Sequence, residues 1–396
     1  MHKIYADNAA TTRLSDFAFE AMLPYFKEHY GNPSSLYSIG QKAEEAMVKS
    51  RETVAKYLNA NPKGITFTSG GSEADNQAIL SVAYNEGKKG KKHIISSAFE
   101  HHAVLHTLNK LKNQGFEITL LPVHEDGYIR IEELKEAIRE DTALVTIMFA
   151  NNEVGTIQPV REIGQVCREN KVIFHTDAVQ AGGHIPIDVE KMNIDMLSLS
   201  GHKFHGPKGV GVLYAKPGIK LESLIEGGAQ ERGKRAGTEN VPAIVGFAAA
   251  FEYANENMQK NIKHSTAIRD ALNEGLAKIP YSKLNGGPGD RLPGTVNVCF
   301  EGVEGESLLL LLDDAGISVS SGSACASGSL EPSHVLLALG LPHEIAHGSL
   351  RISVNEYNSI DEVDYMVNEI AKSVEYLRQM SPIWDDLEKG SIKHVI

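Results

Sequence analysis

The chain has few cysteines and no long hydrophobic run, and these absences exclude several classes of protein. Cys167, Cys299 and Cys325 are its only cysteines, which is too few for a disulfide framework and includes no closely spaced pair for zinc. No apolar stretch approaches the roughly 20 residues that a membrane-spanning helix needs. The first residues also lack the apolar segment of a signal peptide, so we expect a cytoplasmic location.

An excess of positive charge is missing as well. The formal net charge of -12 argues against a surface that binds nucleic acid non-specifically, so we expect neither nucleic-acid nor membrane partners. Internal repeats and low-complexity tracts are absent from the sequence. The 396 residues are enough for two or three domains of about 100 to 200 residues each.

Apolar segments of strand length alternate with amphipathic segments between about residues 45 and 260. The expected strands are 65–67, 93–96, 116–121, 143–148, 172–175, 194–199 and 210–214, and the expected helices are 48–58, 73–84, 103–113, 131–138 and 160–169. This order predicts an α/β domain with a mostly parallel sheet covered by helices on both faces. From about residue 261 a smaller α+β domain is expected, with helices 265–278, 305–315 and 360–380 and strands 294–300 and 349–354.

Lys203 lies just after the apolar strand 194–199 and before a turn rich in glycine and proline. Ligands of such sheets bind beyond the carboxyl ends of the strands. Burial and cationic neighbours lower the pKa of a lysine placed there, and pyridoxal phosphate (PLP) enzymes form their Schiff base with a lysine of this kind. The alternative is a solvated turn lysine, and only distant partners in the sequence decide between the two.

Two other strand ends carry residues that suit this cofactor. Residues 68–76 combine two glycines and several hydroxyls at the start of a helix, where free N–H groups favour a phosphate. The alternative there is that Ser72 is simply an N-cap. Asp177 follows strand 172–175 and can hydrogen-bond to a pyridine nitrogen, although a capping aspartate is the simpler interpretation.

Two further strand ends offer a flat ring and a polar amide. His101 follows strand 93–96, and Asn152 follows strand 143–148. Together with Lys203, these segments supply a phosphate cradle, an acid, a ring and an amide, which are the contacts that PLP requires.

The motifs that carry these residues resemble one family closely. Tyr5-Ala-Asp-Asn-Ala-Ala-Thr-Thr12, the run 200–209 around Lys203, Arg235-Ala-Gly-Thr-Glu-Asn240 and Ser320-Ser-Gly-Ser-Ala-Cys-Ala-Ser-Gly328 occur in order along almost the whole chain. They resemble the cysteine desulfurases of the NifS and IscS type, which are class V aminotransferase-like PLP enzymes of fold type I. The resemblance implies a large PLP-binding domain over residues 15–260 with a seven-stranded sheet. It implies a small α+β domain formed by residues 1–14 and 261–396, which carries a mobile cysteine loop at about 320–332.

The resemblance also implies roles for individual residues. Lys203 would be the Schiff-base lysine, and the other implied cofactor-binding residues are Gly71, Ser72, His101, Asn152, Asp177, Gln180, Ser200, His202 and Thr238. Within this set, His101 would stack on the ring and Thr238 would reach the phosphate from a second subunit. Arg351, together with Asn152, would bind the substrate, since its planar fork suits a carboxylate. Many relatives have Ala-Thr where this chain has Gly71-Ser72.

Cys325 differs from the other two cysteines in its surroundings. Cys167 and Cys299 lie in segments expected to be core, whereas Cys325 is surrounded by serine, glycine and alanine. Half of the loop 320–332, about six residues, would reach on the order of 20 Å if extended. The thiol could therefore move between a buried cofactor and an external acceptor, although an incidental loop cysteine is the alternative.

The family resemblance implies conversion of L-cysteine to L-alanine, with the sulfur retained as a persulfide on Cys325. Lys203 would remove the Cα proton, and His101 would donate or accept a proton. The implied partners are a second copy of the chain, an iron-sulfur scaffold protein of the IscU or NifU kind, and tRNA-thiolation proteins. We expect no resident metal, only transient contact of the persulfide with a nascent cluster. The tail 381–396, with an exposed Trp384, is either a docking segment or a frayed end.

Three alternative functions remain open from the sequence. The first is another PLP enzyme of this fold, an aminotransferase or a selenocysteine lyase. The second is a non-catalytic scaffold for sulfur-handling partners. The third is a metal hydrolase, although the spacing of its histidines fits no compact ligand motif: His101, His102, His106, His202 and His205.

Overall fold

The computed structural model describes residues 3–321 and 332–396. Its largest sheet has seven strands, confirming the expected mostly parallel α/β fold. In spatial order they are β2 (Ile65–Thr68), β8 (Gly211–Ala215), β7 (Met196–Ser200), β6 (Ile173–Asp177), β5 (Thr142–Thr146), β3 (His93–Ser97) and β4 (Glu117–Leu121). β8 runs antiparallel to both of its neighbours, β2 and β7, and the other neighbouring strands of this sheet are parallel.

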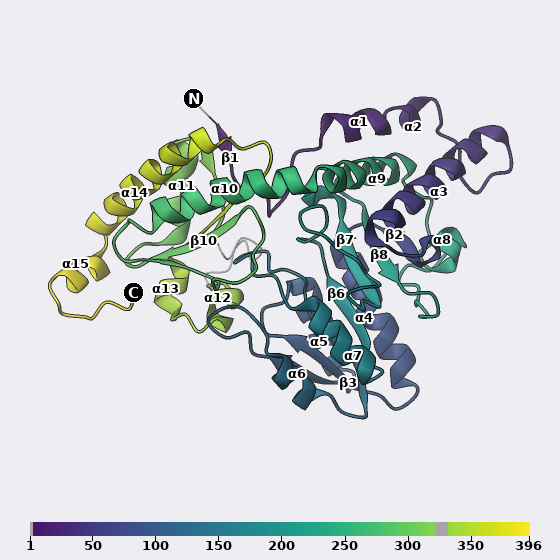
Figure 1. Cartoon of the computed structure of the whole chain (residues 1–396), viewed down its shortest axis with the longest axis horizontal. Coiled ribbons are helices and arrows are strands. Elements are labelled where there is room, and N and C mark those ends of the chain that lie inside the picture. Colours follow the sequence, from purple (N-terminus) through teal and green to yellow (C-terminus); the bar gives the residue numbers. More distant parts are fainter. Residues whose placement is uncertain (1–2, 322–331) are drawn as a thin grey trace.

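Helices bury both faces of this sheet because successive strand residues point to opposite sides. Leu144, Met196 and Leu213 pack on one face in a core with α4 (Gly71–Gly87) and α5 (His102–Lys112). The other face forms a larger core with helices that include α3 (Ser38–Leu58), α6 (Ile131–Ala137), α7 (Val160–Glu169) and α9 (Val241–Glu256). Short helices α1 (Asp16–Met22), α2 (Pro24–Lys27) and α8 (Gln230–Gly233) lie outside these layers (Figure 1).

A second, separate core gathers the N-terminal strand and most of the chain after α9. Its sheet has the order β12 (Ser349–Ser353), β10 (Thr295–Phe300) and β9 (Ser282–Leu284), all antiparallel. The helices around it are α10 (Met258–Leu276), α11 (Gly305–Asp314) and α14 (Val363–Gln379). The N-terminal strand β1 (Ile4–Tyr5) pairs in parallel with β11 (Ile317–Ser318), so the first residues of the chain lie among its last elements (Figure 1). We refer to the elements of this second core as the small domain: β1, β9, β10, β11, β12, α10, α11 and α14.

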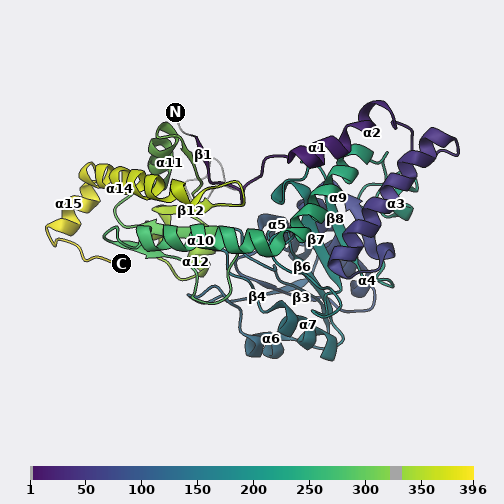
Figure 2. The same cartoon turned by 45° about the horizontal axis from the view of Figure 1, so that its top comes forward.

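The remaining helices are short. α12 (His334–Ala338) and α13 (His343–His347) pack on the larger core of the seven-stranded sheet. α15 (Pro382–Glu388) and the C-terminus lie at one end of the molecule, and α2 and α3 lie at the other (Figure 2). Within the described ranges the 3₁₀ turns are Pro62–Gly64, Gly201–Lys203 and Ile360–Glu362. None of the helices in the described ranges is long and apolar enough to cross a membrane.

Two helices begin earlier than the sequence predicts. α3 begins at residue 38 rather than 48, and α10 begins at residue 258 rather than 265. In α3 the added turns contain Gly40, which packs so closely that a Cβ atom there would lie 2.6 Å from the carbonyl oxygen of Asn32. Close backbone packing of this kind leaves no periodic pattern of large apolar residues, so hydrophobic periodicity could not reveal the early start of α3.

Candidate active site

A cavity of about 270 Å³ opens at the carboxyl edge of the seven-stranded sheet. Asp177 is the last residue of β6 and Ser200 is the last residue of β7, and both line it. The N-terminal segment and β12 contribute to its wall through Ala9, Ala10 and Arg351. The structure therefore brings together most of the predicted site residues: Gly71, Ser72, His101, Asn152, Asp177, Gln180, Ser200, His202, Lys203 and Arg351.

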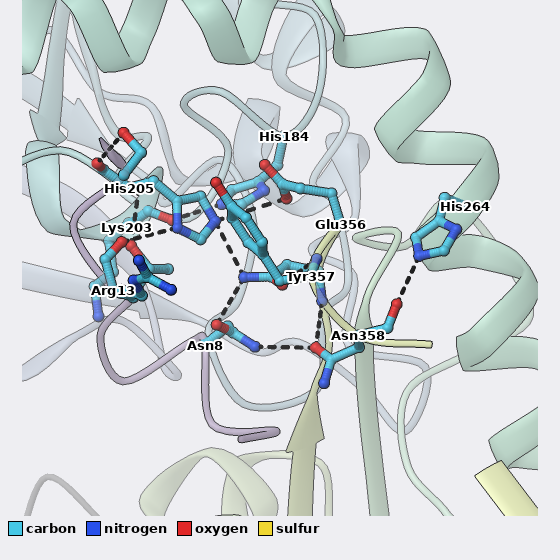
Figure 3. Close-up of polar contacts among 12 residues, drawn as sticks. Asn8, Arg13, His184, Lys203, His205, His264, Glu356, Tyr357 and Asn358 are labelled. Atoms are coloured by element: carbon cyan, nitrogen blue, oxygen red, sulfur yellow. Dashed lines mark hydrogen bonds and ion pairs between the residues drawn. The ribbon is translucent and has the colours of Figure 1, made fainter. Parts of the chain in front are cut away.

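Lys203 ends the 3₁₀ turn that follows β7, and the residue is half-buried. Its Nζ donates to the carbonyl oxygens of Ala9, at 2.6 Å, and Ala10, at 2.9 Å. The backbone oxygen of Lys203 accepts a hydrogen bond from Nε2 of His184 at 2.9 Å (Figure 3). The amine faces the cavity together with its hydrogen-bond acceptors, which favours the site interpretation over a solvated turn lysine; the Schiff-base role of Lys203 stays a prediction.

The start of α4 forms the end of the cavity expected to bind phosphate. Gly70, not Ser72, is the N-cap, so the simpler interpretation of Ser72 is wrong and its hydroxyl lies in the first turn. The N–H groups of a first turn have no acceptor within their own helix. A Cβ atom on Gly71 would lie only 2.6 Å from Cγ2 of Val179. Glycine thus allows the helix start to approach the β6 loop closely.

Asp177 shares its buried surroundings with a second acid that the sequence analysis missed. Its Oδ1 accepts the N–H of Val179 at 2.9 Å. Burial raises the pKa of Asp177, while nearby His101 and Lys203 oppose that rise. Asp75 is fully buried on α4, and its pKa is raised well above its ordinary value by burial and by the charge of Asp177. The pKa of Asp75 is raised more strongly than that of Asp177, so Asp177 is the acid of the pair that ionises more readily.

A helical spacing could have revealed Asp75. It lies four residues after Gly71, one turn along α4, and so projects on the same side of the helix. The carbonyl acceptors Ala9 and Ala10 carried no comparable signal, because main-chain groups are not visible in the side-chain pattern.

His101 is the N-cap of α5, and this contact fixes the proton on its ring. Nδ1 accepts the backbone N–H of Ala103 at 3.1 Å, so the neutral imidazole carries its proton on Nε2. Burial, helped by the positive charge of Lys203, lowers the pKa of His101. Burial also lowers the pKa of His202 to about 4. Both rings are therefore neutral at neutral pH.

Arg351 enters the cavity from β12 of the small domain. Its Nη2 pairs with Oδ1 of Asp7 at 2.8 Å, and Nη1 donates to the backbone oxygen of Asn152 at 3.3 Å. The guanidinium is buried, yet its Nε has no hydrogen-bond partner among the described residues. A buried charge with an unused donor suits an incoming carboxylate.

These features fit PLP on structural grounds. The cavity holds an amine at Lys203, a buried acid at Asp177, a neutral ring at His101 and the start of α4 with its free N–H groups. A phosphorylated pyridine aldehyde needs each of these groups.

The segment that contains Cys325 lies outside the described residues, but its neighbours on both sides are near the cavity. Ser320 and Arg351 exchange backbone hydrogen bonds, the N–H of Ser320 donating at 3.1 Å and that of Arg351 at 2.6 Å. On the other side, Ser333 Oγ donates to Oε2 of Glu153, the residue after Asn152. The described chain therefore ends at residue 321, next to a residue paired with Arg351, and resumes at residue 332, next to a residue bonded to Glu153.

Thr238 is separate from the cavity within one chain. It is exposed and lines a different hollow with Glu231 and Arg235. Its expected contact with a phosphate in a second subunit stays a prediction.

The other cysteines are structural. Cys167 and Cys299 are buried, and burial raises the pKa of both thiols, that of Cys299 to about 11. Within the described ranges, no group of three or more histidine, cysteine, aspartate or glutamate residues could hold a metal ion. The rings of His102 and His106 stack 5.1 Å apart instead, so the described histidines give the metal hydrolase hypothesis no support.

Comparisons with known proteins identify the family of the chain. The Aminotransferase class-V family matches residues 4–366. The curated cysteine desulfurase IscS of Clostridium botulinum is 54% identical over 392 residues, 98% of each chain. A solved NifS-like protein is 42% identical with a TM-score of 0.89 and covers 95% of this chain and 100% of its own. SspA, solved in complex with cysteine, is 39% identical with a TM-score of 0.79 and covers 90% and 100%. The chain therefore belongs to the class-V aminotransferase family, among the cysteine desulfurases of the NifS and IscS type.

Proposed function

We propose that this protein transfers the sulfur of L-cysteine to Cys325 and releases L-alanine. The thiolate of Cys325 forms a sulfur–sulfur bond, the Cβ–S bond of the substrate breaks, and its electron pair takes up a proton to become a C–H bond of alanine. The reaction balances without an external oxidant, because the transferred sulfur is oxidised as the carbon is reduced. The observation that carries the proposal is the shared cavity of Lys203, Asp177 and Arg351, with both neighbours of the Cys325 segment beside it.

The cavity residues would hold PLP, which draws electrons away from the Cα atom of a bound amino acid. Asp177, in its ionised form, would hydrogen-bond to the pyridine nitrogen and keep it protonated. Ser72, Ser200 and His202, with the backbone of Gly71, would hold the phosphate beside the start of α4. Asn152 and Gln180 would lie near the 3'-oxygen.

Arg351 would orient the substrate by its carboxylate. Asp7 and the Asn152 carbonyl hold the guanidinium in place, which leaves Nε for a new acceptor. One of the structural relatives was solved with cysteine bound, which supports this substrate. Nζ of Lys203, once released from Ala9 and Ala10, would take the proton from Cα. Nε2–H of His101 would donate a hydrogen bond inside the cavity.

The partners follow from the same family. We propose a homodimer in which Thr238 completes the phosphate site of the other subunit. The persulfide would pass to an iron-sulfur scaffold protein of the IscU or NifU kind or to tRNA-thiolation proteins. A cytoplasmic location and a role of residues 381–396 in docking stay predictions. Trp384 is half-buried rather than exposed, because its ring packs 4.1 Å from the guanidinium of Arg378.

Two variants test the reaction. Lys203→Ala should lose covalent attachment of the cofactor, and borohydride trapping followed by peptide mass mapping should label Lys203 in the wild type. Cys325→Ser should keep the visible absorbance of the bound cofactor but lose sulfur transfer. Normal alanine and sulfide production by Cys325→Ser would remove the persulfide step. Rates on cysteine and selenocysteine would separate a desulfurase from a selenocysteine lyase.

A further inference from the structure

His205, two residues beyond Lys203, has a left-handed backbone conformation that non-glycine residues rarely adopt. Its φ is +65°. The N-terminal segment holds both of its backbone polar groups. The N–H of His205 donates to Oγ1 of Thr12 at 2.8 Å, and its carbonyl accepts from the N–H of Ser15 at 3.0 Å. Strained conformations persist where the surrounding structure over-determines them, and they concentrate near functional sites.

The imidazole of His205 joins the N-terminal segment to the small domain (Figure 3). Nδ1 donates to the backbone oxygen of Arg13 at 2.9 Å. In a neutral ring Nε2 is then an acceptor, and Nδ2 of Asn355 lies 3.1 Å from it. The amide of Asn355 can only be oriented this way, because its Oδ1 accepts the N–H of Tyr357 at 3.0 Å. The same Nδ2 donates to Oδ1 of Asn8 at 2.7 Å.

This network is buried and its donors match its acceptors. Asn8, His205 and Asn355 are each less than one-tenth exposed, and none of their buried side-chain nitrogen or oxygen atoms lacks a partner. Glu356 lies 3.6 Å from Nε2 of His205, too far for a direct hydrogen bond. A buried polar network that is fully satisfied specifies one arrangement of the segments that it joins.

The joined segments are those that form the wall of the cavity. Ala9 and Ala10, which accept hydrogen bonds from Lys203, directly follow Asn8. Arg351 lies four residues before Asn355, on the strand that leads into the network. The distance between Lys203 and Arg351 therefore depends on how the turn after Lys203 is fixed to the small domain.

We propose that His205 is a positioning residue that fixes the Lys203 turn to the small domain through its hydrogen bond with Asn355. This inference rests on the proposed function, because it assumes that Lys203 holds the cofactor. His205 does not line the cavity and acts only through Lys203 and the N-terminal segment.

Three substitutions separate the two hydrogen bonds from the backbone strain. In His205→Gln the terminal oxygen can replace Nε2 and accept from Asn355. In His205→Asn the shorter amide can replace Nδ1 and donate to Arg13, but it cannot reach Asn355. His205→Gly removes both bonds and adopts positive φ without strain. The measurements are the rate at which the holoenzyme loses its visible cofactor absorbance after gel filtration, kcat and KM for L-cysteine, and the thermal unfolding midpoint.

His124 provides a matched control. It is also a histidine with positive φ, +54°, and it pairs with Glu133 at 3.1 Å outside the cavity lining. The same three substitutions at His124 should leave cofactor loss and both kinetic constants unchanged. Asn355→Ala removes the partner side of the same bond, together with the bonds of Asn355 to Asn8 and Tyr357, without altering the strained backbone. It keeps the inference testable if a variant of His205 fails to fold.

We expect His205→Asn, His205→Gly and Asn355→Ala to lose the cofactor about tenfold faster than the wild type, and His205→Gln to remain within about twofold. A factor of ten corresponds to about 1.4 kcal/mol, the size of one hydrogen bond. The double variant His205→Asn with Asn355→Ala should be no worse than either single change. Equal behaviour of the Gln and Asn variants, or wild-type cofactor retention by Asn355→Ala, would overturn the inference. If borohydride labels another residue in the wild type, the proposed function fails instead.

Discussion

Glu100 gives a prediction about pH and stability that the structure makes quantitative. The side chain is fully buried one residue before His101, and its Oε1 accepts from Ser97 Oγ and from the N–H of Met148. Its Oε2 has no hydrogen-bond partner among the described residues. Burial raises the pKa of Glu100 from 4.5 to about 8. The folded protein therefore keeps a proton on this carboxyl group that the unfolded chain releases at a much lower pH.

The direction of the effect follows from that difference. Because the folded-state pKa is the higher one, the contribution of Glu100 to stability is fully present below about pH 4.5 and is lost as the pH rises toward 8. Between these values the free energy of unfolding should fall by about 1.4 kcal/mol per pH unit, to a total of about 5 kcal/mol. Glu100→Gln does not titrate, so this part of the pH dependence should disappear. The amide of the Gln side chain would leave a polar group without a partner, which would lower the free energy of unfolding by about 1 to 3 kcal/mol at every pH. This loss is constant, so it does not change how steeply the free energy of unfolding depends on pH.

The assay is urea unfolding of both proteins between pH 5 and pH 9 at one fixed protein concentration. The stability of Glu100→Gln relative to the wild type should increase steadily up to about pH 8 and then level off. Glu136→Gln, an exposed change on α6, is the control and should show no such trend. A difference between Glu100→Gln and the wild type that stays constant across this range would refute the reasoning.

Two further predictions concern the cavity itself. Arg351→Lys keeps the charge but loses the planar fork, so KM for L-cysteine should rise by at least about tenfold while the visible spectrum of the bound cofactor stays the same; an unchanged KM would contradict the assigned carboxylate contact. Gly71→Ala would place a Cβ atom 2.6 Å from Val179 and should lower cofactor occupancy, measured as absorbance per protein. Adding Val179→Ala should restore the occupancy, and a single variant with full occupancy would show that the β6 loop can move.

Much of this site could be predicted from the sequence because its side chains follow strands. Asp177, Ser200 and Lys203 lie at or just after the ends of β6 and β7, and parallel strands bring their carboxyl ends to one edge. The seven-stranded sheet was predictable for the same reason, since its strands are apolar runs separated by helices.

The remainder depends on contacts that have no local pattern. The carbonyl groups of Ala9 and Ala10 meet Lys203 across more than 190 residues of sequence. Asp75 follows Gly71 by one helical turn, but its contact with Asp177 has no local pattern and arises only when α4 packs against β6. The half-buried state of Trp384 likewise depends on Arg378, which becomes its neighbour only because α15 turns back on α14.

The pairing of β1 with β11 constrains when the enzyme can become functional during synthesis. Ile4 finds its strand partner at Ile317, and Asn8 bonds to a side chain 347 residues later. The earliest residues to leave the ribosome must therefore wait, unpaired, until more than three-quarters of the chain has been made. A nascent chain that stops short of β11 would contain all seven strands of the large sheet but no fixed acceptor for the Lys203 amine.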